Sequence, residues 1–219
     1  MRLEQERDGR HLGGERRGFF GFGRRRVTGE LEEVTALIPV EPQRRGEGVE
    51  HLVRGADVPA LFEVRGVGTI SPLDDLRVDE WDQMVDVNIK GLLHGIGAAL
   101  PVFRAQGAGH FVTIASTAAF RIVPAMAVYA GTKFAARAIC EGLRQEAGDS
   151  LRVTTVSPGA VRTDFAEAST NPKVRAQITE MRDQMAIPSE AIAQAVAFAI
   201  EQPASVDVNE IVVRPTAQN

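Results

Sequence analysis

The chain has 219 residues, of which 44% are hydrophobic and about a quarter charged, the mix of one ordinary globular domain. A net charge of −4 and a sequence pI near 5.7 argue against nucleic acid or an anionic membrane surface as a partner. No apolar run approaches the ~20 residues of a membrane span, the N-terminus lacks the apolar region of a secretory signal, and the one cysteine cannot form an internal disulfide, so we expect a cytoplasmic protein.

Residues 1–66 differ in composition from the rest of the chain. They hold 12 Arg, 10 Glu and 11 Gly but no Lys, and their apolar residues occur in short runs. The stretch "GFFGFGRRR" (residues 18–26) could be an arm that binds nucleic acid through aromatic and arginine side chains, but we favour a poorly ordered, Gly-rich segment. The composition therefore predicts a division into residues 1–66, aberrant and poorly ordered, and residues 67–219, the folded portion.

Regular patterns begin at Val67. The stretch "SPLDDLRVDEWDQMVDVNIKGLLHGIGAALPVFRAQG" (residues 71–107) carries apolar residues at helical spacing. The later elements, in chain order, are a strand at 109–116, a helix at 125–148, a strand at 151–159, a helix at 189–202 and a strand at 206–216. Helices that alternate with apolar strands predict an α/β, Rossmann-like, doubly wound parallel sheet, here with its N-terminal strands missing or irregular. Ligands of such sheets bind beyond the carboxyl ends of the strands.

Four polar residues do not fit the core pattern. Ser116 closes the strand at 109–116, Tyr129 and Lys133 lie one helical turn apart, and Asn88 interrupts the apolar stripe of the first helix. Each has an ordinary structural explanation when taken alone. Ser116 could cap a helix, Tyr129 and Lys133 could be a half-buried phenol beside a solvated ammonium, and Asn88 could bond to a neighbouring loop. Together they suggest proton transfer, because an ammonium one turn away would lower the pKa of a phenol from about 10 and a hydroxyl nearby could hold the same substrate oxygen.

From about Gly66 to its C-terminus the chain resembles the short-chain dehydrogenase/reductase family. The resemblance rests on four pieces in the family's order and spacing. They are "DVNIKG" around Asn88, "TIAST" with Ser116, "YAGTK" with Tyr129 and Lys133, and "SPGAVRTDF" (residues 157–165). The stretch "NEIVVRPTAQ" (residues 209–218) is similar to the branch of clavulanate dehydrogenase and 3-hydroxy acid dehydrogenases.

The resemblance implies an NAD(P)-dependent oxidoreductase that moves a hydride between nicotinamide and a ketone or secondary alcohol. Tyr129 would be the general acid or base, Lys133 would lower its pKa and bind the nicotinamide ribose, and Ser116 would orient the substrate oxygen. Asn88 would anchor a water relay behind Lys133. The nicotinamide loop would comprise Pro158, Gly159, Val161 and Thr163. NADP is the expected cofactor, with NAD possible, and no metal ion is expected.

The resemblance also implies a partner and a substrate. The family's dimer interface uses the helices that match 79–105 and 125–147, so we expect a homodimer or homotetramer. Small residues that would permit close approach of these helices are Gly91, Gly95, Ala98, Ala99, Ala135, Ala136 and Ala138. Apolar residues near the expected lid, which predict a small-molecule carbonyl or alcohol with a hydrophobic substituent, are Phe120, Val123, Phe165, Met181 and Met185.

The N-terminal part departs from the family's pattern. The family begins with a strand and a Thr-Gly-x-x-x-Gly-x-Gly turn, whose N–H groups approach the pyrophosphate, and this chain has no such stretch. The family's Asn-Asn-Ala-Gly is replaced by "FEVRGVGTISP", in which Gly66 survives. Residues 1–65 therefore look out of register with the family. We favour a frameshift, inversion or start-site error as the cause, and the alternative is a truly divergent N-terminal half. Two alternatives to an active enzyme follow: a catalytically dead homologue that serves as an oligomerisation or binding module, and a non-functional, frame-disrupted product.

Overall fold

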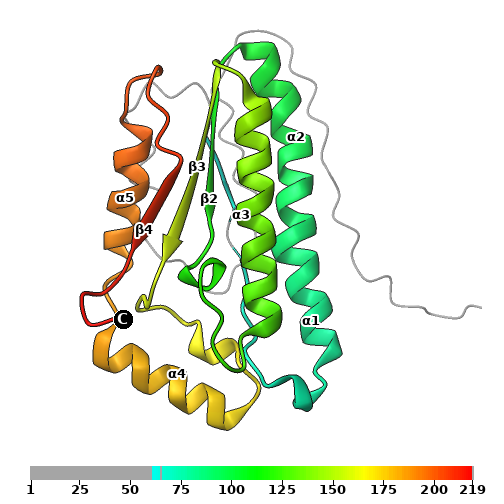
Figure 1. Cartoon of the computed structure of the whole chain (residues 1–219), viewed down its shortest axis with the longest axis vertical. Helices are drawn as coiled ribbons and strands as arrows, with labels where there is room; N and C mark the ends of the chain where they lie inside the picture. Colours follow the sequence, from blue (N-terminus) through cyan, green and yellow to red (C-terminus); the bar gives the residue numbers. More distant parts are fainter. Residues whose placement is uncertain (1–60, 65, 219) are drawn as a thin grey trace, which may run out of the picture. The chain divides into compact units, whose positions relative to one another are not determined.

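The computed structural model describes residues 61–64 and 66–218, and these residues contain a parallel sheet of four strands (Figure 1). The strands are β1 (Leu61–Val64), β2 (Gly109–Ile114), β3 (Leu151–Pro158) and β4 (Glu210–Val213). Their spatial order is β1-β2-β3-β4, and every neighbouring pair is parallel. The sheet confirms the α/β class that alternating helices and apolar strands predict.

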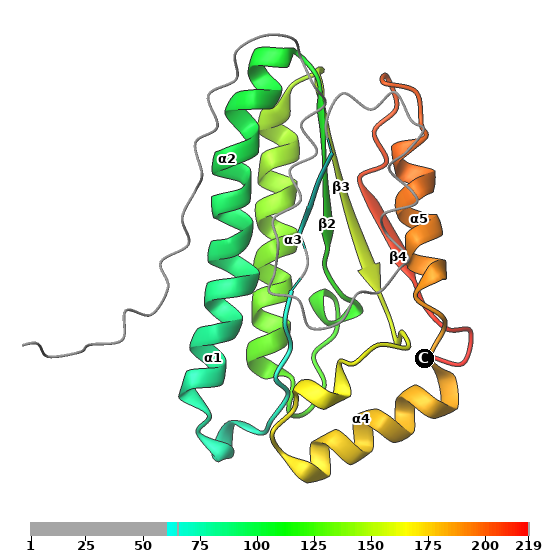
Figure 2. The same ribbon diagram turned by 180° about the vertical axis from the view of Figure 1, so that it is seen from behind.

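Helices cover both faces of this sheet (Figures 1 and 2). The helices are α1 (Val78–Val85), α2 (Gly91–Gln106), α3 (Ala127–Ala147), α4 (Pro172–Met185) and α5 (Glu190–Ile200). Helices α2 and α3 pack on one face and α5 on the other, while α4 crosses below the carboxyl ends of the strands (Figure 1). Short 3-10 turns lie at Leu73–Asp75, Thr117–Ala119 and Ala166–Ala168. Among the described helices, none is both long and apolar enough to cross a bilayer.

Each face of the sheet has its own apolar core. Between the sheet and helices α2 and α3, the Phe103 and Phe111 rings pack with centroids 4.8 Å apart, beside the buried Cys140 and Val153. On the other face, Ile200 of α5 packs with buried strand residues. Full burial of one such side chain stabilises the fold by about 1.5–3 kcal/mol. The two cores fix the strands, and thereby hold the loops at their carboxyl ends in place.

Several features differ from the sequence-based expectation. Strand β1 lies upstream of Val67, because Leu61–Val64 pairs in register with residues 110–113 of β2. The first long helix is interrupted by a π-helical turn, Asp86–Lys90. Helix α3 begins two residues later than expected, because Ala125 adopts a left-handed conformation with φ of 66°. The predictions for residues 1–60, including the poorly ordered segment and the "GFFGFGRRR" arm, lie outside the described residues.

Candidate active site

The predicted polar residues converge at the carboxyl end of β2. Ser116 follows β2 and begins the 3-10 turn Thr117–Ala119, while Tyr129 and Lys133 lie in the first two turns of α3. Asn88 occupies the middle of the π-helical turn between α1 and α2. Such turns are rare and frequently occur at functional sites. Four residues from three segments of the chain are thus brought to one place.

The side chain of Ser116 lies close enough to the hydroxyl of Tyr129 to affect its pKa. Ser116 Oγ accepts a hydrogen bond of 3.1 Å from the Ala118 N–H. Tyr129 is only 9% exposed. Burial raises the pKa of Tyr129, and Ser116 lowers it by less. In the protein without ligands burial therefore sets the direction of the shift, and the lowering that the sequence predicts from Lys133 stays a prediction.

Lys133 is a buried ammonium beside this pair. Its Nζ donates a hydrogen bond of 2.9 Å to the carbonyl oxygen of Ile114, the last residue of β2, and lies 5.8 Å from the centroid of the Tyr129 ring. The side chain is 4% exposed, and burial lowers its pKa to about 8. An ammonium has three donors, and the structure gives one of them a partner among the described residues. This group can donate to hydroxyls of a bound ligand.

Asn88 clamps two segments together. Its Oδ1 accepts from the N–H of Val67 at 2.8 Å, and its Nδ2 donates to the carbonyl oxygen of Val67 at 2.8 Å. The Nδ2 also donates to Thr132 Oγ1 at 2.9 Å, and Thr132 in turn donates to the carbonyl oxygen of Tyr129. Both N–H groups of the Asn88 amide are therefore used to tie the segment after β1 to the helix that carries the Tyr-Lys pair.

Two glycines after β1 allow this close packing. A Cβ at Gly66 would lie 2.6 Å from Lys133 Nζ and 2.7 Å from Asn88 Oδ1. A Cβ at Gly68 would lie 2.3 Å from the Phe165 ring and 2.9 Å from the Tyr129 ring. Any side chain at either position would displace a polar residue of the site, so glycine is required by space at both.

The loop after β3 forms another side of the site. Pro158, Gly159 and Val161 are partly buried, whereas Thr163 is exposed and its hydroxyl lies 3.5 Å from the carbonyl oxygen of Val161. The loop is attached to the segment after α4, since the Arg162 N–H donates to the Ile187 carbonyl oxygen at 2.9 Å. The structure therefore brings this loop to the same edge of the sheet as the Ser-Tyr-Lys group.

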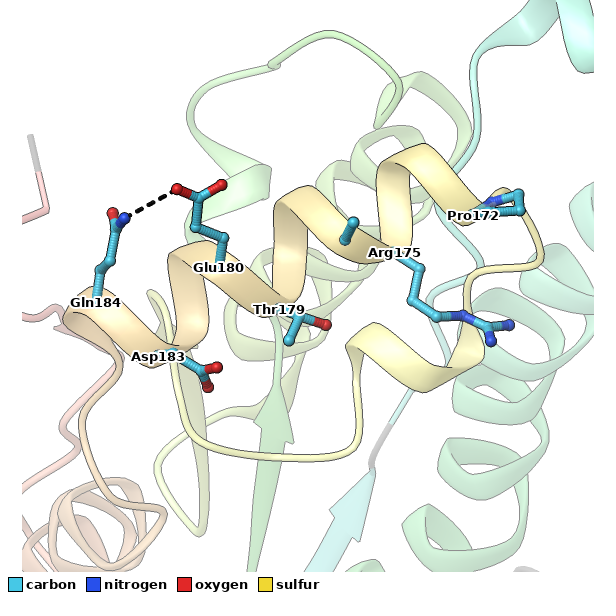
Figure 3. Close-up of a pocket in the computed structure, with 7 residues that line it drawn as sticks. Pro172, Arg175, Thr179, Glu180, Asp183 and Gln184 are labelled. Atoms are coloured by element: carbon cyan, nitrogen blue, oxygen red, sulfur yellow. Dashed lines mark hydrogen bonds between the residues drawn. The ribbon is translucent and has the colours of Figure 1, made fainter.

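Helix α4 and the loop before it cover the site with apolar side chains. The Phe165 ring lies 5.3 Å from the Tyr129 ring, centroid to centroid, and Met181 packs against the same cluster as Val174 and Ile178. The opposite face of α4 is polar and bears an open, shallow hollow (Figure 3). The hollow is lined by Pro172, Arg175, Ala176, Thr179, Glu180, Asp183 and Gln184. The apolar face of α4 and the loop before it thus packs in the same cluster as Tyr129.

The family model described as short chain dehydrogenase matches residues 44–174, more than half of the chain. The chain belongs to the short chain dehydrogenase family. The match begins before Gly66, so the family's pattern extends further toward the N-terminus than the four motifs reach. As a family member, the protein is an oxidoreductase by descent.

Relatives of this short chain dehydrogenase agree with that assignment. An uncharacterized oxidoreductase of Staphylococcus saprophyticus is 44% identical over 165 residues, which cover 74% of this chain and 67% of the relative. One from Listeria monocytogenes is 42% identical over 168 residues, covering 75% of this chain and 68% of the relative. The chain thus spans about two thirds of the length of the curated relatives that it matches.

Solved structures of the family have the same fold. The closed form of a serine dehydrogenase complexed with NADP+ matches with a TM-score of 0.66 and 27% identity, covering 73% of this chain and 66% of that chain. An alcohol dehydrogenase from the archaeon Thermococcus sibiricus, complexed with 5-hydroxy-NADP, matches with a TM-score of 0.61 and 27% identity, covering 73% and 63%.

Three participants in the site of this short chain dehydrogenase were not found from the sequence. The sequence did contain a signal for Thr132, because the hydroxyl of a threonine in a helix interior, here beside Lys133, needs a hydrogen-bond partner. Gly68 and Gln218 had none, because their importance arises from segments that meet after folding.

Proposed function

We propose that the protein reduces ketones, and oxidises secondary alcohols, that carry a hydrophobic substituent, with NADP as cofactor and NAD as the alternative. The observation that carries the proposal is the convergence of Ser116, Tyr129 and the buried Lys133 ammonium beside the end of β2, with Lys133 Nζ 5.8 Å from the centroid of the Tyr129 ring. A binding module would have no need for two hydroxyls and an ammonium in a desolvated pocket, where unpaired polar groups are costly.

The residues at the nicotinamide end fit such a cofactor. Lys133 has spare donors for ribose hydroxyls. Pro158, Val161 and Thr163 would line the same side of the nicotinamide. The two solved relatives that were crystallised with NADP+ and 5-hydroxy-NADP support NADP as the cofactor class. A bound nicotinamide would supply the hydride for the carbonyl carbon.

Each side chain has one task in the reduction. Ser116 donates a hydrogen bond to the substrate oxygen and orients it. Tyr129 donates its hydroxyl proton to that oxygen as negative charge develops on it. Lys133 stabilises the resulting phenolate electrostatically, since it lies beside the ring. Asn88 holds the helix that carries the Tyr-Lys pair against Val67, and its role in a water relay behind Lys133 is a further part of the proposal. Alcohol oxidation reverses these steps.

The experiment compares the full chain with Tyr129→Phe in a ketone reduction assay at millimolar NADPH. The substrate panel pairs ketones that carry aromatic or branched aliphatic groups with small charged keto acids. We expect turnover of the apolar ketones by the parent chain and none above background by Tyr129→Phe. Phe134→Leu, an exposed change on the same helix, is the matched control and should keep its activity. Equal turnover by the parent and Tyr129→Phe would exclude the proposed mechanism, and a preference for charged keto acids would exclude the substrate class.

A further inference from the structure

The tail that follows β4 returns to the loop after β3. The N–H of Gln218 donates to the carbonyl oxygen of Pro215 at 3.0 Å, which closes a tight turn, and Pro215 itself is buried. This turn directs the Gln218 side chain toward the loop of residues 158–162. There Gln218 Oε1 accepts a hydrogen bond of 2.8 Å from the N–H of Ala160. The amide joins residues that are 58 positions apart in the sequence.

The backbone of this loop is held from two sides. The Gly159 N–H donates to the carbonyl oxygen of Val213 at 2.8 Å, and the Arg162 N–H donates to that of Ile187 at 2.9 Å. Between these two anchors, the carbonyl oxygen of Ala160 accepts from the Ile187 N–H at 3.1 Å. The Ala160 N–H is bound by a side chain, that of Gln218, whereas both flanking anchors are main-chain carbonyls. One substitution can therefore release this peptide and leave its neighbours bound.

Gly159 and Gln218 are matched in shape. A Cβ at Gly159 would lie 2.1 Å from Gln218 Oε1 and 3.2 Å from Pro215 Cδ. The amide thus occupies the space that a side chain at position 159 would fill. The glycine permits a close approach of the tail to the loop, and the tail then limits the freedom that the glycine gives to the loop.

We propose that Gln218 is a positioning residue that fixes the Gly159-Ala160 peptide and so presets the loop that receives the nicotinamide end of the cofactor. The inference rests on the proposed function, because the loop matters to catalysis through the cofactor that it contacts. A loop that is fixed before binding does not have to be ordered by the ligand, and it keeps the reacting atoms at the required separation. Gln218 acts through this loop and touches no reacting atom.

The experiment uses the full chain and three variants. Gln218→Met matches the length of glutamine and removes the acceptor, Gln218→Glu keeps an acceptor oxygen, and Thr216→Val alters an exposed neighbour in the same tail. Amide hydrogen exchange is measured at Ala160, with Arg162 as the internal reference. Steady-state kcat and the KM for NADPH are measured with an apolar ketone. Thermal unfolding reports the stability of each variant.

We expect Gln218→Met to speed exchange at Ala160 by about tenfold without a matching change at Arg162, because one hydrogen bond is worth roughly 1 kcal/mol, or about a factor of five to ten. The ratio kcat/KM for NADPH should fall by a similar factor, while the melting temperature falls by no more than about 2–4 °C, the shift that 1 kcal/mol causes in a chain of this size. Gln218→Glu should restore protection of Ala160, and Thr216→Val should match the parent.

Two results would overturn the proposal. In one, Gln218→Met leaves Ala160 exchange and kcat/KM within about twofold of the parent, which is less than one hydrogen bond would change. In the other, the variant melts earlier but the folded fraction has the kinetic constants of the parent, which is the behaviour of a structural anchor alone. If the parent chain shows no turnover, the proposed function fails separately, and exchange at Ala160 still decides whether Gln218 fixes the loop.

Discussion

At the scale of single residues, the proposed proton donor is Tyr129. It is the one tyrosine of the chain, so the ultraviolet absorbance of phenolate reports its ionisation directly. Because burial raises its pKa above the usual 10, we expect it to titrate above 10 in the folded protein and near 10 in denaturant. Ketone reduction should then be level around neutral pH, while alcohol oxidation, which needs the phenolate, should rise with pH. Titration below 10 in the folded, ligand-free chain would contradict this account.

Another prediction at this scale concerns His110, which is buried in β2. Its Nε2 lies 2.7 Å from Thr154 Oγ1, and burial together with the Arg152 charge lowers its pKa to about 3. Below about pH 6.5 the unfolded chain binds a proton at His110 and the folded chain does not. The contribution of this group to the free energy of unfolding is therefore fully present above that pH and is lost as the pH drops toward 3. Between pH 7.5 and 5 this one group should cost roughly 2 kcal/mol of unfolding free energy.

His110→Gln provides the test, because glutamine can bond to Thr154 and does not titrate. Urea unfolding of the parent and the variant at the two pH values gives the difference in slope. We expect the variant to lose less stability on acidification. Parallel pH profiles would mean that His110 is protonated in the folded protein as well.

At the scale of elements, α4 is attached to the segment before α1 by Asn171. Asn171 Oδ1 accepts from the N–H groups of Lys173 and Val174, at 3.0 and 3.2 Å, and so caps the helix. Its Nδ2 donates to Asp75 Oδ2 at 2.6 Å. Asn171→Ala should cost about 1 kcal/mol through the lost cap, with a further loss from the unpaired Asp75.

Hydrogen exchange can test this locally, because it reports on α4 and α3 separately. In Asn171→Ala we expect faster hydrogen exchange within residues 172–185 and unchanged exchange in α3. Asn171→Ser keeps a capping oxygen but cannot reach Asp75 in the same way, so it should recover most of the helix protection. Uniform loss of protection across both helices would show that α4 does not open as a separate element.

The elements that the sequence predicts are those with local signals. The Tyr129-Lys133 pair needs only the pitch of one helix, and the strands β2 and β3 are rich in apolar and β-branched residues. Helix α4 was missed because few of its residues are apolar, although the Asn171 cap followed by Pro172 is a recognised start signal. Strand β1 has four residues and is defined by its pairing with β2, which no local pattern reports.

The same distinction explains the site. Ser116, Tyr129, Lys133 and Asn88 were found because their polar character breaks an apolar pattern. The raised pKa of Tyr129 could not be predicted from the sequence, because desolvation depends on how Phe165 and α4 pack over the ring. Contacts of Gln218 depend on where the tail after β4 runs, which follows from the completed sheet.

At the scale of the whole molecule, we expect a homodimer or homotetramer. Of the small residues proposed for the interface, Gly95, Ala99 and Ala136 are buried within the chain, where they serve the packing of α2 on α3. The exposed apolar residues of the same helices are Leu93, Val102 and Phe134. Phe134→Glu would place a charge on this surface and should yield a monomer by light scattering at micromolar concentration. A monomeric parent chain would count against the expectation.

The last prediction concerns the cofactor as a whole. Lys133 and the 158–163 loop can hold the nicotinamide end, but the sequence lacks the glycine turn whose N–H groups bind the pyrophosphate. Without that preorganised anion site the diphosphate loses hydration and gains few partners. We therefore expect the chain to bind NADPH at best with a millimolar Kd, about −4 kcal/mol. A chimera with a standard family N-terminus before Val67 should bind tightly and reduce ketones, and Tyr129→Phe in the chimera should keep binding and lose turnover. Micromolar binding by the unmodified chain in calorimetry would show that residues 1–66 do supply a pyrophosphate site.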